Sequence, residues 1–327
     1  MVEAVARTSA EGVDSMSVVL LAGGLTPSPL ASAARTPALR LFPDGAHSVL
    51  AHWLDRLGSL ASTEEPIEVR VVFDSARDAD QPPILTGPMR VVFENESGKY
   101  RGPAGVARDV ALPLPGEGTV LIAEANRWLL EDLGPLMATH EARRADVTVA
   151  RQADGAPAGL YLTRRSALEL IPSRGFLDMK EQWLTRTMEA GLNVFVHTFD
   201  GGGAAPLRTR EDVLRLARTL ADDRMGGRMD ARAGASADAG DRVLGDAEPA
   251  PGTSWRVVSP LAEVDATATI AGSVVMPGAR VEANAVLARA VAPPGAVVRA
   301  GARLVDAVAP GDHVVAARMG LGLEVER

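Results

Sequence analysis

The chain has 327 residues, of which 46% are hydrophobic and 23% are charged. This composition is that of an ordinary globular protein and argues against wholesale disorder, collagen-like structure or a coiled coil along the whole chain. The formal net charge of −8 argues against nucleic acid and anionic membranes as partners, and the absence of cysteine excludes disulfides, thiolate metal sites and cysteine nucleophiles.

Residues 1–15 contain three acidic residues and lack the basic start and apolar run of a signal peptide. We therefore expect a flexible leader and a cytoplasmic protein. Strand-like β-branched runs then cover residues 17–22, 68–73, 89–93, 119–123, 146–150 and 194–198. Apolar residues at helical spacing cover residues 48–60, 105–112, 129–144, 178–191 and 209–220. This alternation predicts one α/β domain over residues 16–220, with helices on both faces of a sheet.

The composition changes at residue 221. Residues 221–255 are small or charged with almost no bulky apolar side chain, which predicts a flexible linker. Aliphatic residues then recur mostly every six positions over residues 256–318, with glycine, alanine and proline between them, a pattern that a β-solenoid satisfies. This part resembles the hexapeptide-repeat proteins, whose coils form a left-handed parallel β-helix, and its length predicts about three coils. The repeated positions are Val264, Ile270, Val275, Val281, Leu287, Val298, Leu304, Val308 and Val314.

Two glycine-containing motifs are candidates for ligand binding. The first predicted strand ends in Leu21-Ala22-Gly23-Gly24, and glycines directly after a strand let backbone N–H groups approach a phosphate without interference from a Cβ. About 80 residues further on, Arg101-Gly102-Pro103-Ala104-Gly105 leads into a predicted helix. A third cluster, Gly201-Gly202-Gly203, is predicted to be a flexible turn, with a phosphate cradle as the alternative.

Together with residues 120–140, 144–150, 158–161 and 175–181, this ordered set resembles the sugar-phosphate nucleotidyltransferases, or NDP-sugar pyrophosphorylases. The resemblance is strongest to mannose-1-phosphate guanylyltransferase-like members that carry a C-terminal β-helix. It implies a Rossmann-like mixed sheet and a reaction in which a sugar 1-phosphate attacks the α-phosphorus of a nucleoside triphosphate, giving an NDP-sugar and pyrophosphate. For an active enzyme it also implies Mg2+ as cofactor.

The resemblance also implies which residues form the sites. Lys180 and Arg35 are the candidate catalytic cations, and only Lys99 and Lys180 are lysines in this chain. For Lys180, the alternative is a solvated surface charge within a helical charge pattern. The sugar-phosphate site would contain Gly159, Lys180 and Glu181. The nucleotide site would contain Leu21, Ala22, Gly23, Gly24, Gly102, Ala104 and Gly105.

The chain departs from the family pattern at the groups that neutralise charge. Residues 23–28 read GGLTPS, without the family's third glycine and arginine, and Arg35-Thr36 replaces its Pro-Lys. Asn126 stands where the family has a metal-binding aspartate, and Glu124 is the remaining nearby candidate ligand. Each such group contributes transition-state stabilisation, so we predict a nucleotidyltransferase fold with a degraded or altered active site.

The alternative is a non-catalytic subunit that senses a nucleotide sugar or acts as a scaffold for an active paralogue. In both cases the partners would be nucleotides and sugar phosphates or nucleotide sugars. The β-helix could mediate assembly into a homo-oligomer or with the paralogue, because short solenoids leave open ends.

Overall fold

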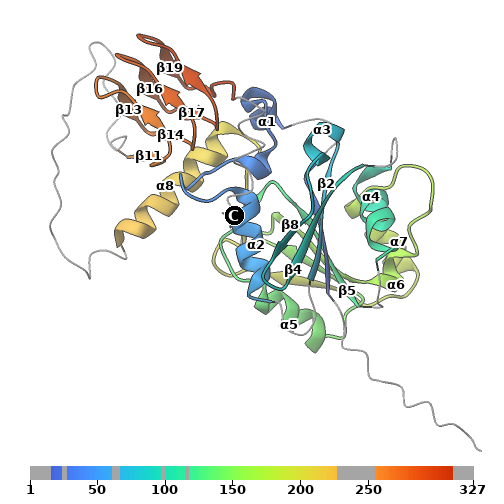
Figure 1. Cartoon of the computed structure of the whole chain (residues 1–327). Helices are drawn as coiled ribbons and strands as arrows, with labels where there is room; N and C mark the ends of the chain where they lie inside the picture. Colours follow the sequence, from blue (N-terminus) through green and yellow to red (C-terminus); the bar gives the residue numbers. More distant parts are fainter. Residues whose placement is uncertain are drawn as a thin grey trace, which may run out of the picture. The chain divides into compact units, whose positions relative to one another are not determined.

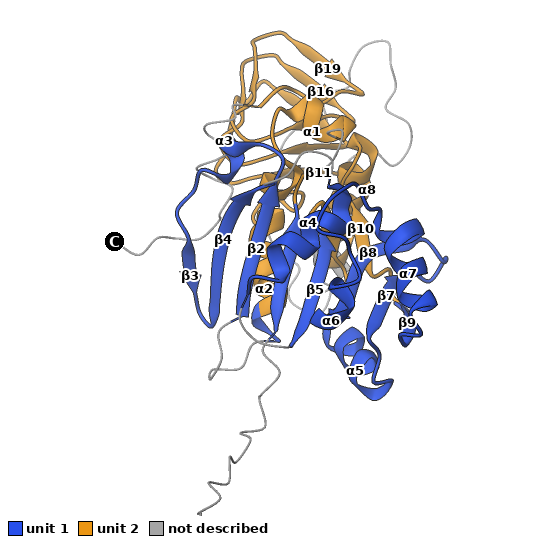
Figure 2. Ribbon diagram, turned by 90° about the vertical axis from the view of Figure 1, so that its right-hand side faces the viewer, with its two compact units in different colours: residues 1–21, 58–124, 132–200 blue, residues 22–57, 125–131, 201–327 orange. Residues whose placement is uncertain are grey.

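The computed structural model describes residues 16–23, 28–60, 67–96, 101–114, 118–226 and 255–311, with residues 224–226 described by their backbone only (Figure 1). The chain divides into two compact units that alternate along the sequence (Figure 2). Unit 1 spans residues 1–21, 58–124 and 132–200, and unit 2 spans residues 22–57, 125–131 and 201–327. The division into units therefore does not follow the predicted boundary near residue 220. The predicted leader, residues 227–254 of the predicted linker and residues 312–318 lie outside the described residues.

Unit 1 is built on a mixed sheet of eight strands in the order β3-β4-β2-β1-β5-β8-β7-β9. Neighbours are antiparallel at β3–β4, β5–β8 and β7–β8 and parallel elsewhere. The six strands predicted from the sequence are confirmed with small shifts at their ends, whereas β3 and β8 were not among the six. The strands are β1 (Ser17–Leu21), β2 (Ile67–Phe73), β3 (Ile84–Thr86), β4 (Met89–Asn95), β5 (Thr119–Glu124), β7 (Val147–Arg151), β8 (Pro157–Arg164) and β9 (Val194–Thr198).

Helices cover both faces of this sheet, as predicted. On one face, α4, α6 and η2 bury apolar side chains against β1, β5 and β8, in a core that includes Val19, Ile122 and Trp183. On the other face, α5 packs on β7, where the His140 and Thr148 side chains hydrogen-bond at 2.8 Å. The helical elements of unit 1 are α3 (Ala76–Ala79), α4 (Gly102–Ala111), α5 (Gly134–Ala142), α6 (Arg165–Leu168), the π-helix η2 (Met179–Trp183) and α7 (Leu184–Glu189).

Unit 2 combines three stretches of the chain. Its helices are α1 (Pro29–Ala34), the 3-10 turn η1 (Ala38–Arg40), α2 (Val49–Gly58), whose last residue belongs to unit 1, and α8 (Arg210–Gly226). Two short antiparallel strands, β6 (Arg127–Leu129) and β10 (Ala204–Pro206), pair beside them. The predicted helix over residues 129–144 was wrong at its start, because Leu129 ends β6 and the helix begins at Gly134. Helix α8 continues to Gly226, past the predicted start of the linker at residue 221. No helix formed by the described residues is long and apolar enough to span a membrane.

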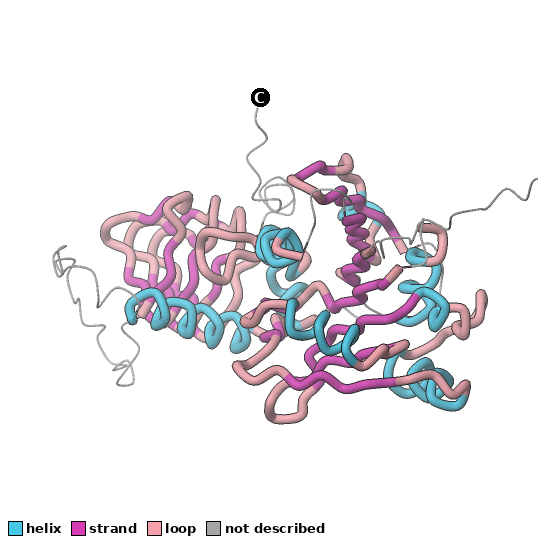
Figure 3. The backbone as a smooth tube through the Cα atoms, turned by 90° about the horizontal axis from the view of Figure 1, so that it is seen from below, coloured by secondary structure: helices cyan, strands magenta, loops and turns pink. Residues whose placement is uncertain are grey.

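The C-terminal part of unit 2 is a short parallel β-helix of three coils. Its three sheets are β11-β14-β17, β12-β15-β18 and β13-β16-β19. Helix α8 runs along the sheet that contains β14 (Figure 3). The strands are β11 (Arg256–Val258), β12 (Glu263–Val264), β13 (Thr269–Ala271), β14 (Ser273–Val275), β15 (Arg280–Val281), β16 (Val286–Ala288), β17 (Val291–Ala292), β18 (Val297–Val298) and β19 (Arg303–Val305).

Stacked residues of this β-helix are 17 positions apart, as between Ser273 and Ala290. Each coil therefore has 17 residues, so two of its three sides have the predicted six residues and the third side has five. On that shorter side, Ala292 and Ala309 pack in the interior cluster. Val308 was predicted to point inward, but it pairs with Val291 and leaves the interior position to Ala309. Val314 lies outside the described residues, and the left-handed sense of the coils stays a prediction.

Candidate functional site

The order of strands in unit 1 changes direction between β1 and β5. From β1 the chain builds outward through β2 and β4, and it then returns to add β5 on the opposite side of β1. Strands β1 and β5 are parallel, and their last residues, Leu21 and Glu124, are register partners. In open α/β sheets, ligands bind beyond the carboxyl ends of the strands at such a switch point.

A pocket of about 120 Å³ lies at this switch point and is formed by unit 1 alone. It is smaller than the pockets of about 300–1,000 Å³ that enclose a whole drug-sized ligand, so it is suited to one moiety such as a sugar ring or a phosphate. Five elements contribute to it: the ends of β1 and β5, the middle of β8, the start of α4 and the start of η2. The lining residues are Leu21, Pro103, Ile122, Ala123, Glu124, Tyr161, Asp178, Met179 and Lys180.

Lys180 is held at the pocket by the start of η2. The Asp178 carboxylate accepts hydrogen bonds from the backbone N–H groups of Lys180 at 2.7 Å and Glu181 at 2.9 Å, which caps the helix. Met179 and Trp183 are buried, and the Trp183 indole N–H donates to the Ala167 carbonyl at 3.0 Å. The backbone is therefore fixed while the Lys180 side chain remains exposed. Glu181 is also exposed but does not line the pocket.

The segment 101–105 is held against the segment before η2. Gly102 has a φ of +68°, and a Cβ there would lie 2.6 Å from the Leu177 carbonyl oxygen. The Ala104 N–H donates to that same oxygen at 3.3 Å. At Gly105, a Cβ would lie 3.0 Å from the Arg101 Cζ atom. These three residues, predicted to bind nucleotide, thus have packing roles within unit 1, and the Ala104 N–H already has an acceptor.

Gly159 lies in β8 with a φ of +76°, a conformation that favours glycine. Its neighbour Leu160 pairs with Ala123 near the end of β5, and Tyr161 lines the pocket. Gly159 therefore lies beside the pocket-lining residues without lining the pocket itself.

Other predicted site residues fall in unit 2 or outside the described residues. Arg35 is exposed, with a left-handed φ of 54° at the end of α1. The Asn126 side-chain oxygen is buried and has no hydrogen-bond partner among the described residues, while its backbone carbonyl accepts from the Leu207 N–H at 2.9 Å. Ala22 and Gly23 also belong to unit 2, and Gly24 lies outside the described residues.

Two carboxylates at the pocket are the candidate donors for a divalent metal ion. Glu124 and Asp178 are the carboxylates that line the pocket, and Asp178 already caps η2. Within the part of the chain that the structure describes, His, Asp and Glu side chains do not gather in any group of three that could hold a metal ion.

Arg101, Tyr161 and Asp178 entered the sequence analysis only within longer motifs, and none of them was assigned a role at the site. Asp178 carried a readable signal, since an aspartate directly before a helical run is a preferred N-cap. The glycines of the third cluster were predicted as a flexible turn, but the Glu131 carboxylate accepts from the N–H groups of Gly201 at 2.8 Å and Gly203 at 2.7 Å. The backbone cradle therefore exists, and a carboxylate of the chain occupies it.

No family model and no curated protein matches this chain. Among solved structures, it is similar to a putative glucose-1-phosphate thymidylyltransferase from Bacillus anthracis in complex with sucrose, with 16% identity, 64% of this chain and 96% of that chain covered, and a TM-score of 0.48. It is also similar to HddC from Yersinia pseudotuberculosis, with 12% identity, coverage of 62% and 99%, and a TM-score of 0.47. A third is a homologue, from Mycobacterium sp. strain JC1, of Mycobacterium tuberculosis Rv0371c, with 17% identity, coverage of 63% and 97%, and a TM-score of 0.44. We therefore infer the function from the residues of this chain.

Proposed function

We propose that this protein is a sugar-phosphate nucleotidyltransferase-like protein with an altered active site, and that its unit 1 pocket binds the sugar-phosphate part of a nucleotide sugar or a sugar 1-phosphate. The observation that carries the proposal is the position of the pocket at the carboxyl ends of β1 and β5, where the strand order reverses. The motif resemblance from Gly23 to Lys180 supports the same substrate class.

The charged groups at the pocket favour a sugar carrying one phosphate over a triphosphate. Lys180 supplies one ammonium, whose three N–H donors can neutralise a phosphate oxygen. Glu124 and Asp178 supply two carboxylates, which accept hydrogen bonds from sugar hydroxyls and repel additional phosphates. In this proposal Lys180 binds and orients the phosphate, and the carboxylates orient the sugar.

We assign no step to Mg2+, because Asp178, one of the two pocket carboxylates, already caps η2. The resemblance implies Mg2+ for an active enzyme, so the proposal separates two properties. Binding of a nucleotide sugar through this pocket requires no metal ion and should persist in EDTA, whereas nucleotidyl transfer would require charge neutralisation from groups beyond this donor set.

Calorimetry with GDP-mannose, UDP-glucose, ADP-glucose and dTDP-glucose tests the binding. The variant Lys180→Ala should weaken the best ligand about tenfold or more, since a hydrogen bond to a charged group contributes about 1.5–3 kcal/mol. Arg186→Ala is the matched control, because it removes an exposed cation from the adjoining helix α7 that does not line the pocket. Equal affinities of the two variants, or no binding by the natural chain, would contradict the proposal.

A second candidate function is a non-catalytic subunit that senses nucleotide sugars or acts as a scaffold for an active paralogue. The amide at Asn126 favours it, because an amide does not supply the metal-binding carboxylate that the resemblance implies at this position. Release of pyrophosphate from the five common nucleoside triphosphates with mannose 1-phosphate or glucose 1-phosphate and Mg2+ distinguishes the two. Turnover supports the enzyme, and binding without turnover supports the sensor.

A further inference from the structure

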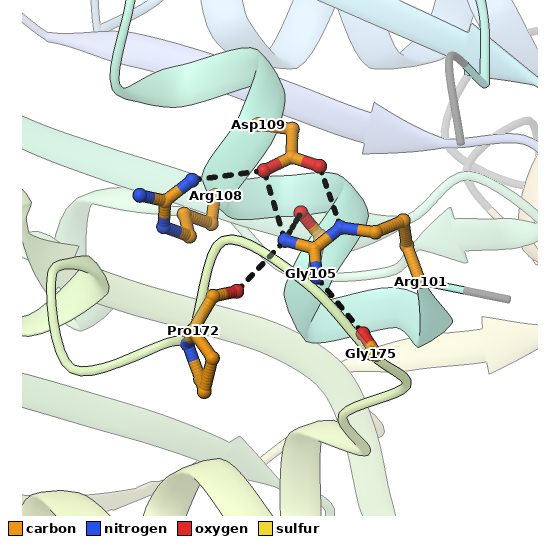
Figure 4. Close-up of polar contacts among 6 residues, drawn as sticks. All are labelled: Arg101, Gly105, Arg108, Asp109, Pro172 and Gly175. Carbon is orange, nitrogen blue, oxygen red and sulfur yellow. Dashed lines mark hydrogen bonds and ion pairs between the residues drawn. The ribbon is translucent and has the colours of Figure 1, made fainter. Parts of the chain in front are cut away.

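Arg101 directly precedes α4, and its side chain is only 7% exposed. Its guanidinium forms a two-point ion pair with Asp109, from Nε to Oδ2 at 2.6 Å and from Nη2 to Oδ1 at 2.9 Å (Figure 4). Such planar pairing fixes the orientation of the guanidinium as well as its charge. Arg101 is therefore a rigid, buried hydrogen-bond donor anchored to α4.

The remaining donors of Arg101 hold a different segment of the chain. Nη1 donates to the Gly175 carbonyl at 2.8 Å, and Nη2 donates to the Pro172 carbonyl at 3.0 Å (Figure 4). The backbone adds a further bond, since the Leu177 N–H donates to the Arg101 carbonyl at 2.9 Å. Residues 172–177 form neither helix nor strand, and residues 172–176 are exposed, so these bonds to Arg101 are a main restraint on the segment.

The segment held by Arg101 continues directly into the residues that line the pocket. Asp178 follows Leu177 and places the Lys180 N–H and side chain at the start of η2. A displacement of residues 172–177 would pull on Asp178, whose carboxylate accepts the hydrogen bond that holds the Lys180 N–H. The segment that Arg101 holds is thus continuous along the chain with Lys180, although Arg101 itself does not line the pocket.

We propose that Arg101 is a positioning residue for the sugar side of the ligand site: it holds residues 172–177 so that Lys180 meets the sugar phosphate. This inference rests on the proposed function of the pocket. Without the guanidinium, the segment samples other conformations, and the apparent affinity falls by the fraction of molecules that keep the binding conformation. The substitution should lower the affinity for the sugar-phosphate part of the ligand and leave the affinity for the nucleotide part unchanged.

The test compares Arg101→Met with Arg108→Met. Arg108 donates to the same carboxylate, with Nη1 3.0 Å from Asp109 Oδ1, but belongs to α4 and has no hydrogen bond to residues 172–177 among those described. Two measurements are made. The first is the calorimetric affinity for the best nucleotide sugar and for its nucleoside monophosphate, which lacks the sugar-bearing phosphate, and the second is the rate of trypsin cleavage after Arg174. That residue is exposed and lies between the two carbonyls that Arg101 holds.

For Arg101→Met we expect about tenfold weaker binding of the nucleotide sugar, an unchanged affinity for the nucleoside monophosphate and faster cleavage after Arg174. These values correspond to a binding conformation of residues 172–177 that falls to about a tenth of the population. Arg108→Met should change none of these. If Arg101→Met is too unstable to purify, Arg101→Lys serves instead, because a single ammonium cannot reproduce the planar fork and should show the same pattern to a smaller degree.

Two results would overturn the inference while leaving the proposed function intact. In the first, the natural chain and Arg101→Met bind the nucleotide sugar with equal affinity. In the second, Arg101→Met loses affinity for the nucleotide sugar and for the nucleotide alone by the same factor. A natural chain that binds no nucleotide sugar refutes the proposed function and, with it, the positioning role. In that case, faster cleavage after Arg174 in Arg101→Met would still show that the arginine holds the segment for a structural reason alone.

Discussion

The close approach of two segments at Gly102 gives a sharp prediction for the variant Gly102→Ala. The left-handed φ of +68° costs an alanine about 1–2 kcal/mol. The new Cβ would also lie 2.6 Å from the Leu177 carbonyl oxygen and 2.9 Å from a ring carbon of Phe176. Relieving such overpacking costs typically about 1–3 kcal/mol. We therefore expect Gly102→Ala to lower the free energy of unfolding by about 2–5 kcal/mol.

The matched control for this variant is Gly87→Ala. Gly87 also belongs to unit 1 and has a φ of +51°, but a Cβ there would meet nothing within 4 Å. Urea unfolding of both variants separates the two contributions, because the control measures the backbone cost alone. If Gly102→Ala destabilises the protein no more than Gly87→Ala does, the contact between Gly102 and residues 176–177 is refuted. Gly102 would then be free for the nucleotide-binding role that the motif predicts.

Two further predictions concern the β-helix and the pH dependence of stability. Arg289 has a φ of 48° at a corner of the coil, and one coil earlier Gly272 occupies the same corner. The variant Arg289→Gly should therefore be more stable in urea unfolding than Arg289→Ala by about 1 kcal/mol. Equal stability of the two variants would contradict backbone strain at this corner. Burial, and then the charge of Arg164, lowers the pKa of His140 below 6.5. The unfolded chain therefore takes up a proton first, so stability should fall as the pH drops from 7 through 6.5, and His140→Gln should flatten this slope in urea unfolding at pH 5–7.

The parts of the fold that the sequence predicted are those with a strong local pattern. Strands β1 and β2 are β-branched runs buried on both sides, and such runs occur because a central strand has helices over each face. The start of α5 was missed because Trp128 and Leu129 continue the apolar spacing of the helix although they belong to β6. Pro135, in the first turn of α5, was the available signal, since proline favours the start of a helix.

Some residues that the family resemblance assigned to the site meet at the pocket in the structure. Leu21 and Lys180, far apart in the sequence, both line the pocket, and Glu124 lines it as well. The packing role of Gly102 could not be predicted, because a glycine needed for phosphate approach and a glycine needed for close packing look the same in a sequence. The hydrogen bonds of Arg101 to backbone carbonyls could not be predicted from the residue types, because every residue has a backbone carbonyl.

The β-helix is tied to the N-terminal stretch of unit 2 by contacts that no local pattern marks. The Phe42 N–H donates to the Met276 sulfur at 3.3 Å across 234 positions of sequence, and the Gly311 N–H donates to the Ala34 carbonyl at 3.0 Å. The repeats are therefore part of the fold of unit 2. The predicted assembly through the β-helix would then need the side chains that these contacts leave exposed. Leu261, exposed at 68%, and Val297, exposed at 44%, are such side chains, and a polar substitution at either would separate a role in assembly from a role in folding.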